Sequence, residues 1–169
     1  EAVRLMALPH LIEELATGFL YSECVISRRE DIVIVSFNPT AMSVEVQLAT
    51  NIQPVFNDKV RSITSACGRG LTFVSALNAG FFRPVTTNTT VLPQTVIDLM
   101  RKLQRNSSLF HDTGGVHSAA IARGNEMLFS CDDIGRHNAE DKALGWLIRA
   151  GQLSYETENT AMLLTTGRL

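Results

Sequence analysis

The sequence predicts a layered α/β domain, a mixed sheet covered by helices. Two segments, residues 8–21 and 93–105, carry apolar residues at the spacing of amphipathic helices. Short apolar runs of strand length lie between and after them, in the order hairpin, helix, two strands, helix and strand, which is typical of helices layered on a sheet. At 169 residues the chain can bury one sizeable core.

The first third of the chain predicts a helix and then a β-hairpin. The helix covers Leu8–Tyr21, with Pro9 near its first turn, where proline is tolerated. Ile32–Val35 and Val44–Leu48 have the composition of strands, and Asn38-Pro39-Thr40 supplies a turn between them.

The rest of the chain predicts the main core: residues 63–169 are expected to form it, and 1–62 a helix-and-hairpin part before it. A helix opens at Pro93 and ends at the Asn106-Ser107-Ser108 cluster. Two strands joined by a tight turn follow, Val116–Ala122 and Met127–Ser130. A helix then begins at Arg136, with Asp132 or Asp133 as its cap and Gly151 as its stop. The last predicted strand is Ala161–Leu164.

Composition and charge exclude several classes of function. The net charge of −2 and a pI of about 6.1 oppose nucleic-acid binding by bulk charge, because neutralising phosphates needs excess Lys and Arg. No apolar window reaches the roughly 18 residues of a membrane span. Three widely spaced cysteines, Cys24, Cys67 and Cys131, form no disulfide framework. A soluble, cytoplasmic protein is expected, with neither nucleic acid nor membrane as partner.

The densest polar stretch, residues 110–145, holds three of the four histidines and suggests a polar pocket. The predicted helix start offers backbone N–H groups, Arg136 and His137, a suitable cradle for an anion. Asn138 and Lys142 lie four residues apart and share a polar face of that helix. The alternative is a capped surface helix with salt bridges.

Gly114 and Gly115 stand before a predicted strand, where positive φ or close backbone approach is expected. His111 and His117 flank them, so this turn is a second candidate for ligand contact or catalysis. A plain turn and a hydrogen-bonded histidine at a strand edge are the alternatives. No zinc motif occurs in the sequence, and no metal site is predicted.

Cys67 is the candidate nucleophile, because it opens the loop Cys67-Gly68-Arg69-Gly70. A thiol becomes reactive when a cation and backbone N–H groups stabilise its thiolate, and Arg69 and the glycines could supply both. The alternative is an inert small hydrophobic residue, the interpretation that suits Cys24 and Cys131.

Two long phrases resemble those of the FdhD family of formate dehydrogenase accessory proteins. FHDTGGVHSAA at 110–120 is similar to the family's F-x-x-T-G-G-x-H-x-A. Residues 132–145, DDIGRHNAEDKALG, are similar to E-D-x-G-R-H-N-A-x-D-K-x-x-G, with Asp132-Asp133 where Glu-Asp is usual. ELATGFLYSE at 14–23 and TTGR at 165–168 extend the resemblance over nearly the whole chain.

The resemblance implies a cytidine-deaminase-like α/β fold without the deaminase zinc motif, and a homodimer. It implies a sulfurtransferase activity: persulfide sulfur passes from a cysteine desulfurase to a molybdenum or tungsten bis-pterin guanine dinucleotide cofactor that formate dehydrogenase needs. The protein would bind this cofactor as a substrate and hold no metal itself. A cofactor chaperone without sulfur chemistry and a zinc-dependent nucleobase deaminase are the rival functions.

The resemblance also assigns roles to residues. Cys67 aligns with the sulfur-carrying first cysteine of the family's C-G-x-C-G loop, and Gly70 stands where the second cysteine is usual. A further family segment after T-x-G-R is expected to be missing here, so that the core is truncated at its C-terminal end. The residues expected to hold the cofactor, or to frame its pocket beside the Cys67 loop, are Gly68, Arg69, His111, Gly114, Gly115, His117, Asp133, Arg136, His137, Asn138 and Lys142.

Overall fold

The computed structural model describes residues 3–50, 52, 61–63, 90–153 and 161–166. Its central feature is a sheet in the order β6-β5-β7, formed by Glu126–Asp133, His117–Arg123 and Met162–Thr165. Both pairings are antiparallel. The predicted strands are confirmed, with boundaries shifted by a few residues.

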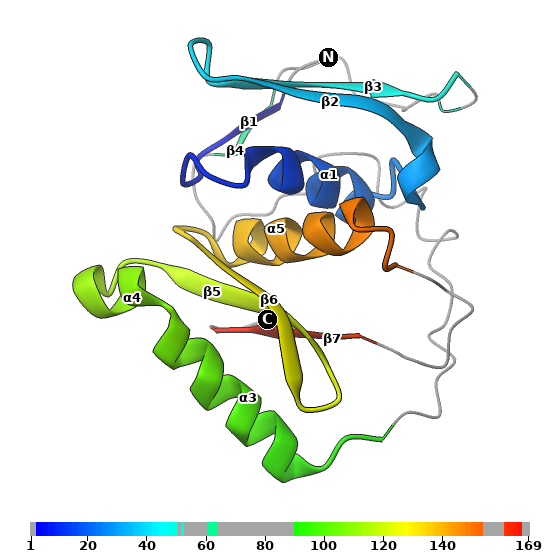
Figure 1. Ribbon diagram of the computed structural model, residues 1–169. Helices are drawn as coiled ribbons and strands as arrows, with labels where there is room; N and C mark the ends of the chain where they lie inside the picture. The colour runs from blue at the N-terminus through cyan, green and yellow to red at the C-terminus, as the bar shows by residue number, and fades with distance from the viewer. Residues whose placement is uncertain (1–2, 51, 53–60, 64–89, 154–160, 167–169) are drawn as a thin grey trace.

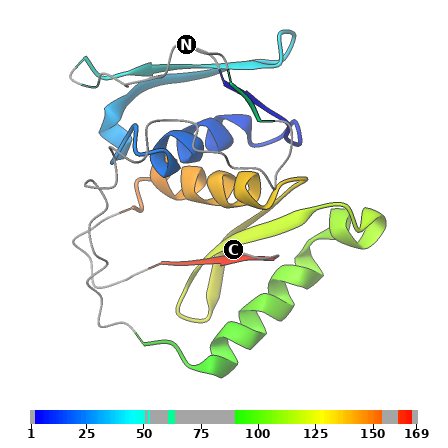
Figure 2. The ribbon, with the colours of Figure 1, turned by 180° about the vertical axis from the view of Figure 1, so that it is seen from behind.

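Helices cover both faces of this sheet, as Figures 1 and 2 show from opposite sides. Helix α5 (Arg136–Arg149) lies on one face and α3 (Pro93–Asn106) on the other. Because successive strand residues point to opposite faces, β5 contributes to two separate cores. The core against α5 contains Ala119, Ile121, Cys131, Ala139, Ala143 and Leu147. The core against α3 contains Leu99, Leu103, Ala120, Ala122 and Leu164.

Helix α1 (Ile12–Ser22) packs on the outer side of α5 and forms a further layer. Glycines allow the two backbones to approach: a Cβ on Gly18 would overlap the carbonyl of Asp141, and one on Gly145 would overlap that of Glu14. At one end of the crossing, Arg149 Nη2 donates to Glu13 Oε2 at 2.7 Å. The crossing of α1 and α5 is therefore fixed by contact between their main chains, which leaves no room for a side chain at Gly18 or Gly145.

The predicted hairpin is confirmed and covers α1. Strands β2 (Ile32–Asn38) and β3 (Ser43–Leu48) pair antiparallel, with an irregularity between Ile32 and Ile34. The short helix η1 (Arg29–Asp31) leads into β2. Parallel pairing occurs, within the described residues, between β1 (Val3–Leu5) and β4 (Arg61–Ile63) and not in the central sheet.

The structure corrects the sequence-based elements at three points: the start of one helix, a helix that was not predicted, and the cap of another. Helix α1 begins at Ile12 and not at Leu8, because Leu11 has positive φ and the Leu8 backbone is bonded to another part of the chain. A short helix, α4 (Ser108–Thr113), follows α3 where the sequence predicts none. The N-cap of α5 is Gly135, with no side-chain cap, so neither Asp132 nor Asp133 caps that helix.

None of the described helices is long and apolar enough to cross a membrane. The mixed α/β class is confirmed. The division at residue 62 stays a prediction, although α1, from the first part, packs directly on α5, from the second.

Replacing Gly145 by alanine is expected to lower the free energy of unfolding by more than about 3 kcal/mol, since the new Cβ overlaps main-chain atoms that cannot move aside. Urea unfolding followed by Trp146, which stacks on Phe129, measures the change. Gly115→Ala is the matched control, because a Cβ there meets only Thr113, at 3.6 Å or more, which is ordinary van der Waals contact. Equal stability of the two variants would contradict the close crossing.

Candidate functional site

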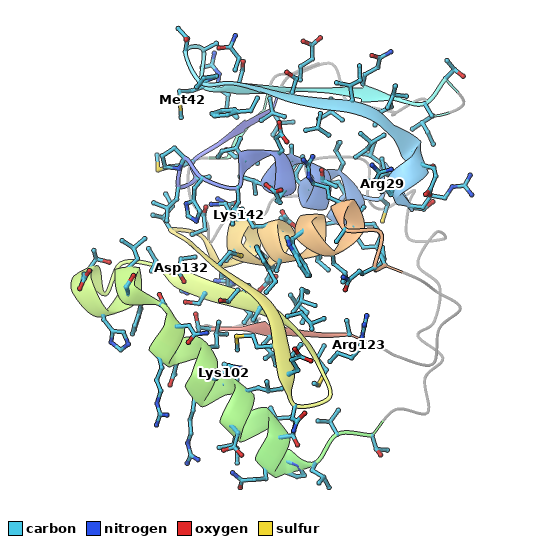
Figure 3. All side chains as sticks on the ribbon, in the orientation of Figure 1. Arg29, Met42, Lys102, Arg123, Asp132 and Lys142 are labelled. Carbon is cyan, nitrogen blue, oxygen red and sulfur yellow. The ribbon has the colours of Figure 1, made fainter. Side chains whose placement is uncertain are left out.

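The polar phrases of the sequence meet at one edge of the central sheet. The start of β5, the end of β6, the start of α5 and helix α4 lie together on the left of Figure 1. Figure 3 shows Asp132 and Lys142 at this edge, with Arg123 at the opposite end of the sheet. We refer to it as the polar edge: residues 107–118, 132–138 and Lys142, with the segment Met6–His10.

A fully buried ion pair lies at the centre of the polar edge. Lys142 Nζ is 2.6 Å from Asp133 Oδ2, and both side chains are 0% exposed. The carboxylate also accepts hydrogen bonds from the backbone N–H of Leu8 and of Gly135 and from Asn138 Nδ2, each at 3.0 Å. Such saturation is what a buried charge needs if it is to remain ionised.

The same network fixes the N-terminal segment. Lys142 Nζ also donates to the carbonyl of Leu8 at 3.1 Å, and Asn138 Nδ2 donates to the carbonyl of Met6 at 2.8 Å. These bonds join residues more than 130 positions apart. Asp133, Asn138 and Lys142 therefore hold Met6–Leu8 against the start of α5.

A second carboxylate, Asp132, faces the other side of the sheet. Its Oδ1 accepts from Ser118 Oγ at 2.6 Å and its Oδ2 from Ser107 Oγ at 2.8 Å. Ser118 is also bonded to the end of β7, through its N–H to Thr166 Oγ1 at 2.8 Å. Asp132 thus joins β6, β5 and the residue before α4.

The surface of the polar edge carries the remaining predicted residues. His111, Gly114 and Gly115 are exposed, and Gly114 ends α4 with a φ of 62°. His117 is half-buried and lies opposite Asp133 in the β5–β6 register. Arg136 and His137, the first two residues of α5, are half-buried.

The fourth histidine also lies here. Desolvation lowers the pKa of His10 below 6.5, and the nearby charge of Lys142 lowers it further, whereas Asp133 and Asp132 oppose the shift. A neutral imidazole can both donate and accept a hydrogen bond near neutral pH. His10 was not predicted as a site residue, because nothing in the local sequence links it to a phrase more than a hundred residues away.

The two described thiols are poorly suited to chemistry. Burial raises the pKa of Cys131 to about 12, and its Sγ donates to the carbonyl of Ala139. Burial, with the neighbouring charge of Glu23, also raises the pKa of Cys24. Cys67, Gly68 and Arg69 lie outside the described residues. Among the residues described, no group of three or more His, Cys, Asp and Glu side chains could hold a metal ion.

Nine of the predicted site residues therefore meet at the polar edge, in two roles. Asp133, Asn138 and Lys142 are buried and bonded within the chain. The other six lie wholly or partly at the surface: His111, Gly114, Gly115, His117, Arg136 and His137.

Fold and site together define a layered α/β protein with a polar, histidine-rich edge. The model of the FdhD/NarQ family matches residues 1–169, and the chain belongs to this family. The match covers both long phrases of the polar edge.

Curated relatives agree with this assignment. Each of the following is named sulfur carrier protein FdhD. The protein of Bacillus licheniformis is 35% identical over 149 residues, 88% of this chain and 57% of the relative. That of Staphylococcus haemolyticus is 36% identical over 141 residues, covering 83% and 53%, and that of Staphylococcus aureus (strain MRSA252) is 32% identical over 162 residues, covering 95% and 60%. The chain thus spans little more than half the length of these relatives.

A solved structure shares the fold. It is described as a formate dehydrogenase accessory protein from Desulfotalea psychrophila, and it matches with a TM-score of 0.67 at 23% identity. The match covers 97% of this chain and 58% of that one. At this level of identity the likeness shows the fold.

Replacing Lys142 by methionine is expected to lower the free energy of unfolding by about 3–5 kcal/mol, because it leaves Asp133 buried and without its cation. Chemical denaturation measures the loss. Arg101→Met is the matched control: it breaks an exposed pair with Asp98, worth about 0–1 kcal/mol. Adding Asp133→Asn to Lys142→Met should recover part of the loss, and no recovery would mean that the uncompensated charge is not its cause.

Proposed function

We propose that this protein is a sulfur carrier in which Cys67 accepts sulfane sulfur from a cysteine desulfurase. The observation that carries the proposal is family membership over residues 1–169, with relatives named sulfur carrier proteins. The described thiols support it by elimination. Sulfur transfer needs a thiolate, and the pKa values of Cys24 and Cys131 are raised above the ordinary value.

The proposed first step needs no oxidant. The Cys67 thiolate attacks the terminal sulfur of a persulfide on the desulfurase, and a new S–S bond forms as the desulfurase cysteine leaves as a thiolate. Releasing that sulfur as sulfide takes two electrons. Because Gly70 stands where the family has its second cysteine, a thiol reductant from outside this loop must supply them.

The course of the chain supports a carrier close to the polar edge. In the parallel pair of β1 and β4, Leu5 lies beside Ile63. Leu5 leads directly into Met6–Leu8, and Ile63 precedes Cys67 by four residues. Four residues of extended chain span at most about 14 Å.

The polar edge is the proposed binding site for the acceptor, a molybdenum or tungsten bis-pterin guanine dinucleotide. Its phosphates would meet Arg136, His137 and the N-terminus of α5. Gly114 and Gly115 leave the backbone of the neighbouring turn accessible, with His111 and His117 beside it. The buried residues Asp133, Asn138 and Lys142 would hold the start of α5 and the neighbouring turn in position without contacting the acceptor.

The proposed client is formate dehydrogenase, in line with the description of the solved neighbour as its accessory protein. A homodimer, a cytoplasmic location and a cytidine-deaminase-like topology complete the proposal and are predictions from the resemblance. A zinc-dependent deaminase has less support, because the sequence contains no deaminase zinc motif.

A cofactor chaperone without sulfur transfer is the second candidate, and the observation that favours it is Gly70. With one loop thiol the chain cannot release sulfur by closing a local disulfide. The polar edge would serve either function, so the state of Cys67 distinguishes them.

Incubation with a cysteine desulfurase and cysteine is expected to add about 32 mass units, one sulfur atom, to Cys67. Peptide mass spectrometry locates the adduct. Cys67→Ser should abolish it, and Cys24→Ser should leave it unchanged, because the raised pKa of Cys24 makes that thiol a poor acceptor. Absence of an adduct on Cys67 would favour the chaperone.

Arg136→Ala is expected to weaken GDP binding about tenfold, as loss of one cationic contact to phosphate would cause. Isothermal titration measures the affinity. Arg101→Ala is the control, because Arg101 carries the same charge on the exposed side of α3, away from the polar edge. Equal affinity of the Arg136 variant and the parent would remove the proposed phosphate site.

A further inference from the structure

Helix α4 is too short to be stable alone. It has six residues, none of them buried. Isolated helices much longer than this are marginal in water, and helices in proteins depend chiefly on packing of an apolar face. Something other than a buried face must therefore hold α4 where it is.

Ser107 and Asp132 supply that support. Ser107 is 4% exposed, and its Oγ accepts from the N–H of Phe110 at 3.1 Å while donating to Asp132 Oδ2 at 2.8 Å. The Ser107 carbonyl accepts from the N–H of His111. Asp132 is itself fixed, because its Oδ1 receives the hydroxyl of Ser118 at 2.6 Å in the facing strand.

The far end of α4 leads directly into the glycine turn. The N–H of Gly114 donates to the carbonyl of Phe110 at 2.8 Å, and the N–H of Gly115 donates to Thr113 Oγ1. The cap at Ser107 on one side and the start of β5 at His117 on the other therefore set the position of this turn. Through Ser107, the carboxylate of Asp132 on β6 contributes to that position.

We propose that Asp132 is a positioning residue of the ligand site: through Ser107 it holds α4 and the Gly114-Gly115 turn beside the start of α5. The proposal rests on the proposed function in one respect, that the turn contacts a guanine nucleotide. Asp132 does not contact the ligand itself; it acts by keeping α4 and the Gly114-Gly115 turn in one position.

The first measurement is amide hydrogen exchange on the full chain without ligand. Asp132→Ala and Ser107→Ala are each expected to speed exchange at His111 and Gly114 by tenfold or more, as loss of a charge-assisted bond to the cap implies. Amides in the middle of β5 should keep the exchange of the parent. Ser107→Ala removes the cap of Phe110 together with the bond to Asp132 and keeps the bond of Asp132 to Ser118, so it still interrupts the chain of contacts if Asp132→Ala does not fold.

The second measurement is GDP affinity by isothermal titration. Asp132→Ala, Ser107→Ala and the double variant are expected to bind about tenfold more weakly, each to a similar extent, because they interrupt one chain of contacts. Asp132→Glu, which keeps the carboxylate, should restore affinity to within about threefold. Asp98→Ala, which removes an exposed carboxylate from α3, is the matched control and should bind as the parent does.

The outcomes distinguish the positioning role of Asp132 from the nucleotide site itself. Unchanged exchange in α4 overturns the proposal, and so does faster exchange with unchanged GDP affinity. Additive losses in the double variant would also overturn it, because they would mean independent effects. If the parent binds no GDP, the proposed nucleotide site fails, and exchange at His111 and Gly114 alone decides whether Asp132 positions α4.

Discussion

The buried pair of Asp133 and Lys142 is the interaction on which the architecture of the polar edge depends. Taking two charges out of water costs several kcal/mol for each ion, and their attraction repays this cost only when the remaining donors and acceptors are bonded. Here the carboxylate receives two backbone N–H groups and an amide besides the ammonium. Because Leu8 lies 125 positions from Asp133 along the chain, the carboxylate has all these partners only when the N-terminal segment is packed against the start of α5.

The helix crossing makes this network possible. Lys142 and Gly145 lie on the same helix, and Gly145 lets α1 approach until its main chain touches that of α5. The close approach places the segment before α1, with Leu8, above Asp133 and Lys142. Any side chain at Gly18 or Gly145 would therefore act on the polar edge indirectly, by moving α1 and with it Met6–His10.

Most regular elements could be predicted because their signals are local. The alternation in Val44–Leu48 and the apolar spacing after Pro93 depend on near neighbours, and the structure confirms both elements. Helix α4 lacks such a signal, because its support is a carboxylate more than twenty residues further along the chain. At the site, Lys142 could likewise be predicted only in part. Its spacing places it on one polar face of the helix with Asn138. That both residues are buried depends on contacts with segments more than 130 positions away.

Two neighbouring carboxylates on β6 hold the interior of the polar edge in place while the groups at its surface stay accessible. Successive residues of a strand point to opposite faces, so Asp133 enters the layer of α5 while Asp132 turns toward the side of α3 and α4. Each carboxylate is hydrogen-bonded to groups of the chain itself, whereas the histidines, glycines and arginine of the polar edge lie wholly or partly at the surface. Asp133 and Asp132 therefore anchor the polar edge on the two faces of the sheet, one through a buried ammonium and the other through two serine hydroxyls.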